Sequence, residues 1–174
     1  DRIAEVARAM PEIELFVNVQ GDEPEIDPAT IDAVAAALIE DPTADMATVA
    51  TPIRDLAVLE DPSCVKVVLA HSGRAVYFSR AVVPHFRDGV TSEVLMQEPP
   101  LYWHHIGLYA YRRGFLEWFA SRPTSSLEQS ERLEQLRAIE AGKQIVVVRV
   151  ARQPPGIDTR EDFDAFRQRI SQAS

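Results

Sequence analysis

The sequence contains a single cysteine, Cys64, and no long apolar run. One cysteine cannot form an intrachain disulfide, so nothing here indicates an oxidising compartment, and we expect a small buried hydrophobic residue. The most hydrophobic short stretch, residues 145–150, includes Arg149 and is far below the roughly 20 residues that a membrane-spanning helix needs. The sequence therefore predicts no membrane span.

Clusters of basic residues are also missing. The chain has 18 Lys and Arg against 27 Asp and Glu, for a net charge of −9. This balance argues against nucleic acid or an anionic membrane as the main partner. A small anionic substrate stays compatible with it, because metal ions and a few focused basic side chains can override the overall sign. There is no Gly-x-Ser-x-Gly motif either, so no covalent nucleophile is expected.

The residues that are present predict one globular domain over 1–174, because 46% are hydrophobic and the length suffices for a core. Strand-like runs alternate with helical periodicity, which favours a three-layer α/β/α fold with a mixed, mainly parallel sheet. Predicted strands cover 13–19, 46–53, 65–69, 75–80, 106–111 and 143–150. Predicted helices cover 1–10, 28–41, 114–120, 126–142 and a terminal segment after Thr159 with Phe163, Phe166 and Ile170 facing inward.

Two local signals refine this picture. Asp27 and Pro28 form a helix start, with Asp as N-cap and Pro at the first helical position. Residues 84–100 contain Pro84, Gly89, Pro99 and Pro100 amid mixed polarity, which predicts a surface loop. The opening residues, 1–10, read as the middle of an amphipathic helix, so we expect a further segment upstream.

Two acidic turns stand out as candidate metal ligands. Asp22 follows the apolar run 13–19, and Asp158 lies in a turn after the last predicted strand. A carboxylate at the end of a buried strand can reach a cation whose charge and waters compensate it. The alternative is that Asp22 belongs to a polar turn and Asp158 caps the last helix.

Six stretches, in this order along almost the whole chain, closely resemble the family of 3-deoxy-manno-octulosonate cytidylyltransferase, also called CMP-Kdo synthetase. They are residues 18–24, 65–69, 77–81, 105–112, 133–137 and 156–159. The resemblance implies a nucleotide-diphospho-sugar transferase-like fold. It also implies a magnesium-dependent, cytoplasmic, typically homodimeric enzyme that converts CTP and the sugar acid Kdo to CMP-Kdo and pyrophosphate for lipopolysaccharide assembly.

The same resemblance implies roles for individual residues. Asp22 and Asp158 match the metal-binding, catalytic aspartates. The positions around the sugar are matched by Gln20, Arg80, His105, Tyr109, Glu134 and Gln135. Pattern alone leaves open plain packing for His105 and Tyr109 and a solvated helix face for Glu134 and Gln135. Lys66 is a weaker candidate for the positive field near an anionic substrate, because a strand lysine can snorkel to the surface.

One departure from the family bears on activity. Its full-length members begin with a strand and a basic, glycine-containing loop that binds the nucleotide, and no such stretch occurs here. We therefore expect the chain to correspond to the carboxy-terminal two thirds or so of the enzyme, with the N-terminal strands of the sheet missing. Two alternatives stay open: a catalytically silent fragment that retains sugar-side and dimer surfaces, or a related enzyme such as CMP-sialate synthetase.

Overall fold

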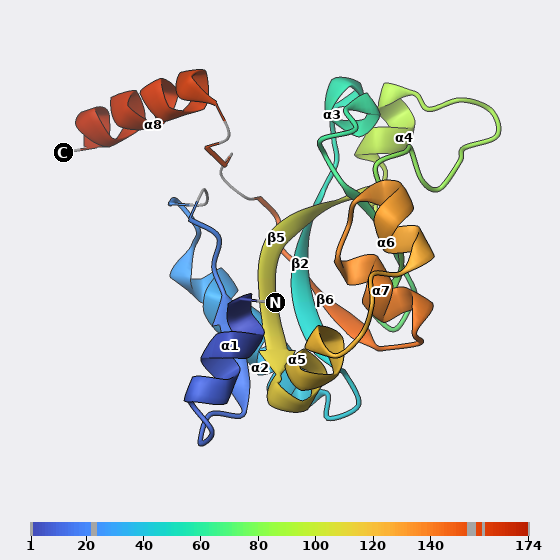
Figure 1. Ribbon diagram of the computed structural model, residues 1–174. Coiled ribbons are helices and arrows are strands. Elements are labelled where there is room, and N and C mark those ends of the chain that lie inside the picture. The colour runs from blue at the N-terminus through green and yellow to red at the C-terminus, as the bar shows by residue number, and fades with distance from the viewer. Residues whose placement is uncertain (1, 22–23, 153–155, 158, 174) are drawn as a thin grey trace.

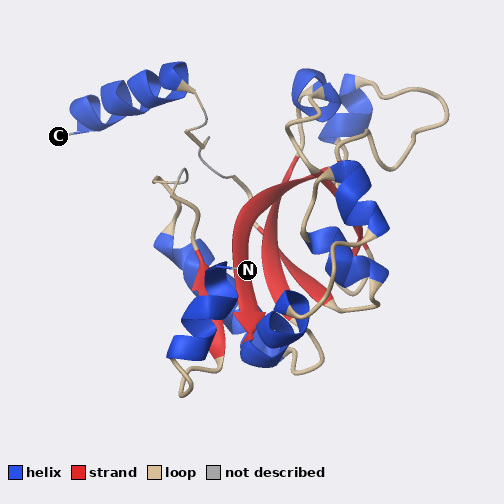
Figure 2. Cartoon of the chain, in the orientation of Figure 1, coloured by secondary structure: helices blue, strands red, loops and turns tan. Residues whose placement is uncertain are grey.

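The structure is a computed structural model that describes residues 2–21, 24–152, 156–157 and 159–173 (Figure 1). Its centre is a curved, mixed sheet with helices on both faces (Figure 2). The strands are β1 (Leu15–Asn18), β2 (Met46–Pro52), β3 (Lys66–Leu69), β4 (Ala75–Ser79), β5 (Trp103–Arg112) and β6 (Ile145–Arg149). The helices are α1 (Arg2–Ala9), α2 (Pro28–Glu40), α3 (Leu56–Glu60), α4 (Ser92–Met96), α5 (Arg113–Ala120), α6 (Ser126–Glu131), α7 (Gln135–Glu140) and α8 (Arg160–Ala173).

The long strand β5 organises the sheet. The strand order is β4-β3-β5-β2-β6, and β1 also pairs with β5. One edge of β5 is paired with β2 along its length, while the other edge holds β3 near its start and β1 near its end. All of these pairs are antiparallel, and β2 runs parallel only to β6.

The α/β class and the mixed, open sheet are confirmed, but the expectation of a mainly parallel sheet is wrong for the described pairings. The reason is the placement of β5. Because this strand runs between β1 and β2 in the opposite direction, two strands that point the same way are kept apart.

Apolar residues on the two faces of the sheet form separate cores. On one face, Val34 and Leu38 of α2 pack against β2 and β5. On the other face, α5 and α7 cover β2, β3, β4 and β6. Helix α1 lies on this second face, because its buried alanines pack with Leu116 of α5. The three-layer arrangement follows from strand alternation, which sends successive side chains to opposite faces.

Several sequence predictions are confirmed at the level of elements. Asp27 accepts a hydrogen bond from the backbone N–H of Ala29 and begins α2 with Pro28 in its first turn. The strand pair 65–69 and 75–80 forms the antiparallel hairpin β3–β4. Residues 2–9 are helical, as the amphipathic pattern of 1–10 predicts, and α5 begins within one residue of its predicted start.

Other predictions need correction. The predicted helix 126–142 is broken into α6 and α7 at Arg132, whose φ of 54° is left-handed. The predicted loop 84–100 contains α4, whose Leu95 is buried with α3 in a small core of its own. Arg54 fixes this region by donating to the carbonyls of Leu95 and Gln97.

The terminal helix also differs from expectation. Helix α8 lies apart from the sheet in Figure 1. Its Phe163 and Ile170 are 39% and 48% exposed, so their predicted inward orientation is wrong. Periodicity indicated the apolar stripe correctly, but it carries no information on whether a surface exists for that stripe to cover.

Two consecutive arginines join the layers at the β5–α5 junction. Arg112 donates to the carbonyls of Leu38 and Asp41 at the end of α2. Arg113 donates to the carbonyl of Ala7 in the last turn of α1 and to those of Met10 and Ile13 beyond that helix. Each guanidinium group thus binds carbonyls in the last turn of a helix or just beyond it.

We predict that Arg113→Lys destabilises the protein by about 2 kcal/mol, because one ammonium group cannot reach the three carbonyls that the planar guanidinium serves. Urea denaturation would measure the loss, with the same exchange at exposed Arg87 as the matched control. Equal midpoints for the two variants would contradict the role given to Arg113.

Candidate functional site

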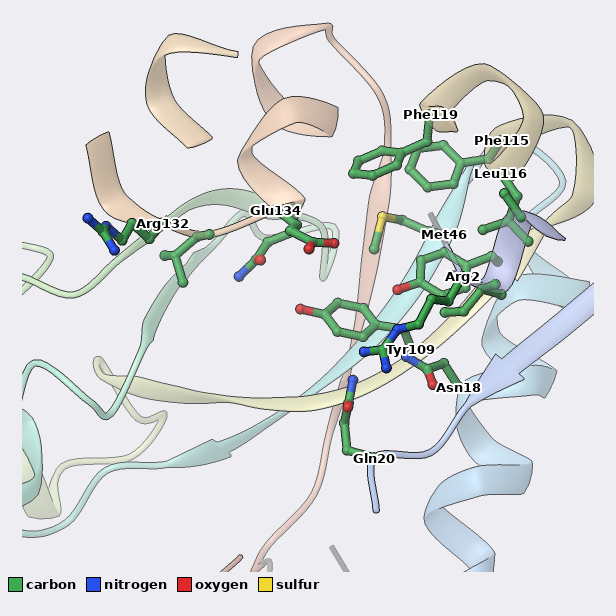
Figure 3. A pocket seen from close by; sticks show the side chains of 15 residues that line it. Arg2, Asn18, Gln20, Met46, Tyr109, Phe115, Leu116, Phe119, Arg132 and Glu134 are labelled. Carbon is green, nitrogen blue, oxygen red and sulfur yellow. The ribbon is translucent and has the colours of Figure 1, made fainter. Parts of the chain in front are cut away.

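A cavity of about 560 Å³ opens on the face of the sheet that carries α1, α5 and α7. Its walls come from distant parts of the sequence (Figure 3). The lining residues are Arg2, Ile3 and Ala4 of α1, Asn18, Gln20, Met46, Tyr109 and Tyr111 of the sheet side, Phe115, Leu116 and Phe119 of α5, and Arg132–Gln135 of the α6–α7 junction. Such a volume with apolar walls and a few convergent polar groups is typical of a small-molecule site.

The polar groups of the cavity are suited to an anionic, hydroxyl-rich ligand. Amide side chains come from Gln20 and Gln135, and a phenol comes from Tyr109. Arg2 and Arg132 add two exposed guanidinium groups at the walls. Amides and phenols can both donate to and accept from hydroxyl groups, while arginines match carboxylates and phosphates. A net acidic protein thus presents cations at this cavity.

A bulge in β5 brings two predicted site residues together. The pairing shifts between Thr48, which faces Tyr109, and Val49, which faces Ile106. Residues four apart in a strand lie on the same face of the sheet, and two extra residues of β5 fall between the partners of Thr48 and Val49. The ring centroids of His105 and Tyr109 are 5.4 Å apart, so the two side chains are in contact.

Gln20 lies beyond the end of β1, beside this bulge. Strand β1 covers Leu15–Asn18, so it is shorter at both ends than the predicted strand 13–19, and Gln20 lies outside it. The side chain of Gln20 instead lies over Gly107, where an added Cβ would meet its Cγ at 3.6 Å. Figure 3 shows Gln20 and Tyr109 on the same side of the cavity.

Burial governs the titration of the aromatic groups. Loss of solvent lowers the pKa of His105 from 6.5 to about 3, with a smaller effect of His104 in the same direction. Burial also raises the pKa of Tyr109, helped by Tyr111 and Glu134. For Tyr111, burial raises the pKa and a hydrogen bond with Asn18 opposes that shift. All three groups are consequently neutral at physiological pH.

The α6–α7 junction positions Glu134 and Gln135 over the sheet. Ser125 and Glu128 form a reciprocal capping box at the start of α6. The same Glu128 receives two hydrogen bonds of 2.6 Å from Arg137, and both side chains are buried. Arg137 also stacks 4.0 Å from the ring centroid of Phe119. This arrangement pins the turn at Arg132, from which Glu134 and Gln135 reach the cavity.

Four of the predicted sugar-side residues, Gln20, Tyr109, Glu134 and Gln135, line the cavity. His105 is not a lining residue, but its ring contacts that of Tyr109. Arg80 lies elsewhere: its Nε donates to the carbonyl of Glu131 at 2.8 Å and its Nη1 to that of Pro62 at 3.0 Å. Its placement in this structure fits a structural clamp better than a place in the cavity wall.

Lys66 is fully buried rather than snorkelling to the surface. Its Nζ donates to the carbonyls of Cys64 at 2.6 Å and Asp61 at 2.9 Å, and Lys66 does not line the 560 Å³ cavity. Carbonyl oxygens therefore compensate this buried charge. Cys64 is buried, as expected.

The two predicted metal ligands, Asp22 and Asp158, lie outside the described residues. Among the residues that are described, no group of three or more His, Cys, Asp or Glu side chains could hold a metal ion. In the described part of the chain, Arg169 of α8 forms an ion pair with Glu25. No described helix is long and apolar enough to cross a membrane.

Sequence reasoning missed Asn18, Tyr111, Arg2 and Arg132 as lining residues. Asn18 and Tyr111 each lie two positions from a predicted residue, so strand alternation could have indicated them. Arg2 and Arg132 had no local signal, because their place at the cavity depends on how α1 and the α6–α7 turn pack.

Comparisons with known proteins place the chain in the cytidylyltransferase class. The family model described as cytidylyltransferase matches residues 1–145. A CMP:2-keto-3-deoxy-manno-octonic acid synthetase, solved in complex with CTP, superposes with a TM-score of 0.88 at 36% identity, covering 100% of this chain and 68% of that one.

The individual relatives narrow the class. The chain is 63% identical to the 3-deoxy-manno-octulosonate cytidylyltransferase of Rhodopirellula baltica over 98% of its length and 68% of the relative. Identities to those of Solibacter usitatus and Syntrophotalea carbinolica are 46% and 48%, covering 94% of this chain and 62% and 65% of the relatives. The chain thus belongs to the 3-deoxy-manno-octulosonate cytidylyltransferase family and spans about two thirds of the length of these relatives.

We predict that Arg137→Met lowers the free energy of unfolding by about 3–5 kcal/mol, because it leaves Glu128 buried without its cation. Adding Glu128→Gln to the first change should recover part of that loss, since the unpaired charge is then removed. Thermal or urea unfolding of both single variants and the double variant would measure the coupling. Strictly additive losses would contradict the proposed pairing.

The pKa of His105 predicts a second effect. As pH falls below 6.5, the unfolded chain binds a proton that buried His105 does not accept until about pH 3. Stability is therefore lost progressively as pH falls through this window. His105→Gln should flatten the dependence of the urea midpoint on pH between about 6.5 and 4. His71→Gln, at an exposed position, serves as the control and should leave the slope unchanged.

Proposed function

We propose that this chain carries the sugar-acid site of an enzyme that transfers the cytidylyl group of CTP to Kdo, giving CMP-Kdo and pyrophosphate. The observation that supports it best is the 560 Å³ cavity, where four residues matching the family's sugar positions converge in a chain of that family. CTP is proposed as the nucleotide substrate because the similar synthetase was solved in complex with CTP.

In the proposed reaction the anomeric hydroxyl of Kdo attacks the α-phosphorus of CTP. A new oxygen–phosphorus bond forms, the bond to the β-phosphate oxygen breaks, pyrophosphate leaves, and the hydroxyl proton is released to solvent or to a nearby base. Such a displacement requires positioning and charge compensation rather than a covalent enzyme intermediate. The absence of a nucleophile motif in the sequence is consistent with that requirement.

The cavity residues divide this task between them. Gln20, Gln135 and Tyr109 are placed to bind sugar hydroxyls. Arg2 and Arg132 are placed to attract the carboxylate of Kdo or a phosphate group. Glu134 can accept hydrogen bonds from hydroxyl groups as a carboxylate. Apolar walls from Phe115 and Phe119 exclude water and strengthen these polar contacts.

Asp22 and Asp158 are our proposal for the magnesium ligands. Carboxylate oxygens are the donors that Mg²⁺ prefers, usually one or two with phosphates and water completing the octahedron. When bound there, Mg²⁺ would neutralise charge on the phosphates of CTP.

We further propose that the protein acts in the cytoplasm as a homodimer and serves lipopolysaccharide assembly. These assignments rest on the family resemblance and on Kdo as the named substrate of the relatives. Analytical ultracentrifugation would measure the oligomeric state, and a concentration-independent monomer would contradict the dimer.

The decisive experiment uses this chain with CTP, Kdo and Mg²⁺, following pyrophosphate release together with calorimetric binding of Kdo. Release of pyrophosphate supports the full activity, whereas Kdo binding without release supports the silent-fragment alternative. Tighter binding of N-acetylneuraminate than of Kdo would instead favour the CMP-sialate alternative. Failure to bind either sugar acid would overturn the proposed site.

We predict that Gln135→Ala weakens Kdo binding by about tenfold, the effect of about one lost hydrogen bond. Gln97→Ala, at an exposed position outside the cavity, is the matched control and should bind Kdo like the parent chain. Calorimetry measures both dissociation constants, and equal affinities of the two variants would remove Gln135 from the site.

For the metal assignment, Asp22→Asn and Asp158→Asn should each abolish Mg²⁺-dependent turnover in a protein that supports turnover, because the amide lacks the charge that holds the cation. Circular dichroism should show an unchanged fold. A variant that retains most of its Mg²⁺-dependent rate would defeat the assignment for that residue.

A further inference from the structure

Thr48 makes unusual contacts for a residue in the middle of a strand. It is completely buried and lies opposite the bulge in β5. Its Oγ1 is 2.9 Å from the carbonyl oxygen of Leu108 and 3.3 Å from that of Ile106. The third contact is with Nε2 of His105, at 3.0 Å. Both carbonyls belong to the bulged part of β5, and the hydroxyl of Thr48 contacts them there.

The number of protons available among Thr48 Oγ1, His105 Nε2 and the two carbonyls determines which group donates each hydrogen bond. A hydroxyl group has one proton, and a carbonyl oxygen can only accept. If Thr48 donates to the carbonyl of Leu108, then Nε2 of His105 must carry the proton and donate to Oγ1. If Thr48 donated to Nε2 instead, two lone-pair oxygens would face each other at 2.9 Å in a buried place, which is costly. The first arrangement is therefore favoured.

The surroundings of the imidazole keep it neutral and fixed. Burial lowers the pKa of His105 to about 3, so the doubly protonated ring is not populated at neutral pH. The ring lies between Phe78 and Tyr109, with centroid distances of 5.0 and 5.4 Å. With the proton on Nε2, the other nitrogen, Nδ1, has a free lone pair.

Nδ1 has no hydrogen-bond partner among the described residues. The only orphaned, buried polar side-chain atom in the described part of the chain is Nε of Arg113. Nδ1 is not among the enclosed atoms without a partner, and His105 as a whole is 8% exposed. A neutral lone pair beside Tyr109 is suited to a hydroxyl donor and not to a carboxylate, which has no proton to give.

We propose that Thr48 is a positioning residue: its hydroxyl holds His105 in the Nε2–H form so that Nδ1 accepts a hydrogen bond from a hydroxyl of the sugar acid. The second half of this statement rests on the proposed function, and the first half does not. The arrangement also orients the ligand, because the carboxylate is left to Arg2 and Arg132 on the walls of the cavity.

The tautomer can be observed directly in this chain. Long-range ¹H–¹⁵N correlation spectra distinguish the protonated from the unprotonated ring nitrogen, and His105→Gln assigns the signal among the four histidines. We expect Nε2–H in the parent chain and in Thr48→Ser, which keeps the hydroxyl. Thr48→Val should lose this single form. An Nδ1–H or doubly protonated ring in the parent chain at neutral pH overturns the proposal without needing any variant.

A titration with Kdo tests the role in binding. We expect the Nδ1 signal to shift with the same saturation as the side-chain amide signals of Gln20 and Gln135, with Nε2 still protonated. Thr48→Val should weaken Kdo about tenfold while Thr48→Ser stays within about twofold. Saturable shifts of the amide signals without a response at Nδ1 overturn the binding role. If none of these signals responds to Kdo, the proposed function itself fails. The tautomer of His105 is tested separately, by the spectra recorded without Kdo.

Discussion

The bulge in β5 opposite Thr48 is the local constraint on which the cavity depends. Two extra residues of β5 lie there, between His105 and Tyr109, whose rings are in contact on one face. The side chain of Gln20 lies over Gly107 at the same bulge. The hydroxyl of Thr48 contacts the carbonyls of Ile106 and Leu108, so these carbonyls have a partner within the core.

Two arginines hold the helices that form the other walls of the cavity. Arg113 binds backbone carbonyls, and Arg137 binds the buried carboxylate of Glu128. Arg113 fixes the end of α1, and the same helix carries Arg2 to the cavity. Arg137 with Glu128 fixes α6 against α7, and the turn between them carries Arg132 and Glu134. Arg113 and Arg137, which bind partners inside the fold, thus help to place Arg2 and Arg132 at the cavity. The overall charge of the protein is nevertheless negative.

Much of this could be predicted from sequence, and the failures have physical causes. Apolar periodicity indicated α1, α2 and α5, and Asp27 with Pro28 marked the start of α2, because these signals are local. Four of the six predicted sugar-side residues reached the cavity through the family motifs. The split of α6 from α7 was missed because a left-handed arginine has no sequence signature comparable to glycine.

Long-range packing explains the other differences. Arg80 and Lys66 donate to backbone carbonyls and do not line the cavity, which no local pattern indicates, and a role for Arg80 at the sugar stays a prediction. Arg2 and Arg132 were overlooked for the converse reason. The neighbours of β5 depend on chain topology, so the excess of antiparallel pairs could not be derived from apolar runs alone.

The consecutive arginines at the β5–α5 junction have a consequence for how this family can vary. Arg112 is the last residue of β5 and serves the layer of α2, whereas Arg113 is the first residue of α5 and serves the layer of α1. Inserting or deleting one residue in the second half of β5 would shift the pairing of this strand with β1 and β2 and displace both guanidinium groups from these carbonyls. We infer that the length of this segment tolerates change less readily than the identity of its exposed side chains, so gaps in homologous sequences should avoid it.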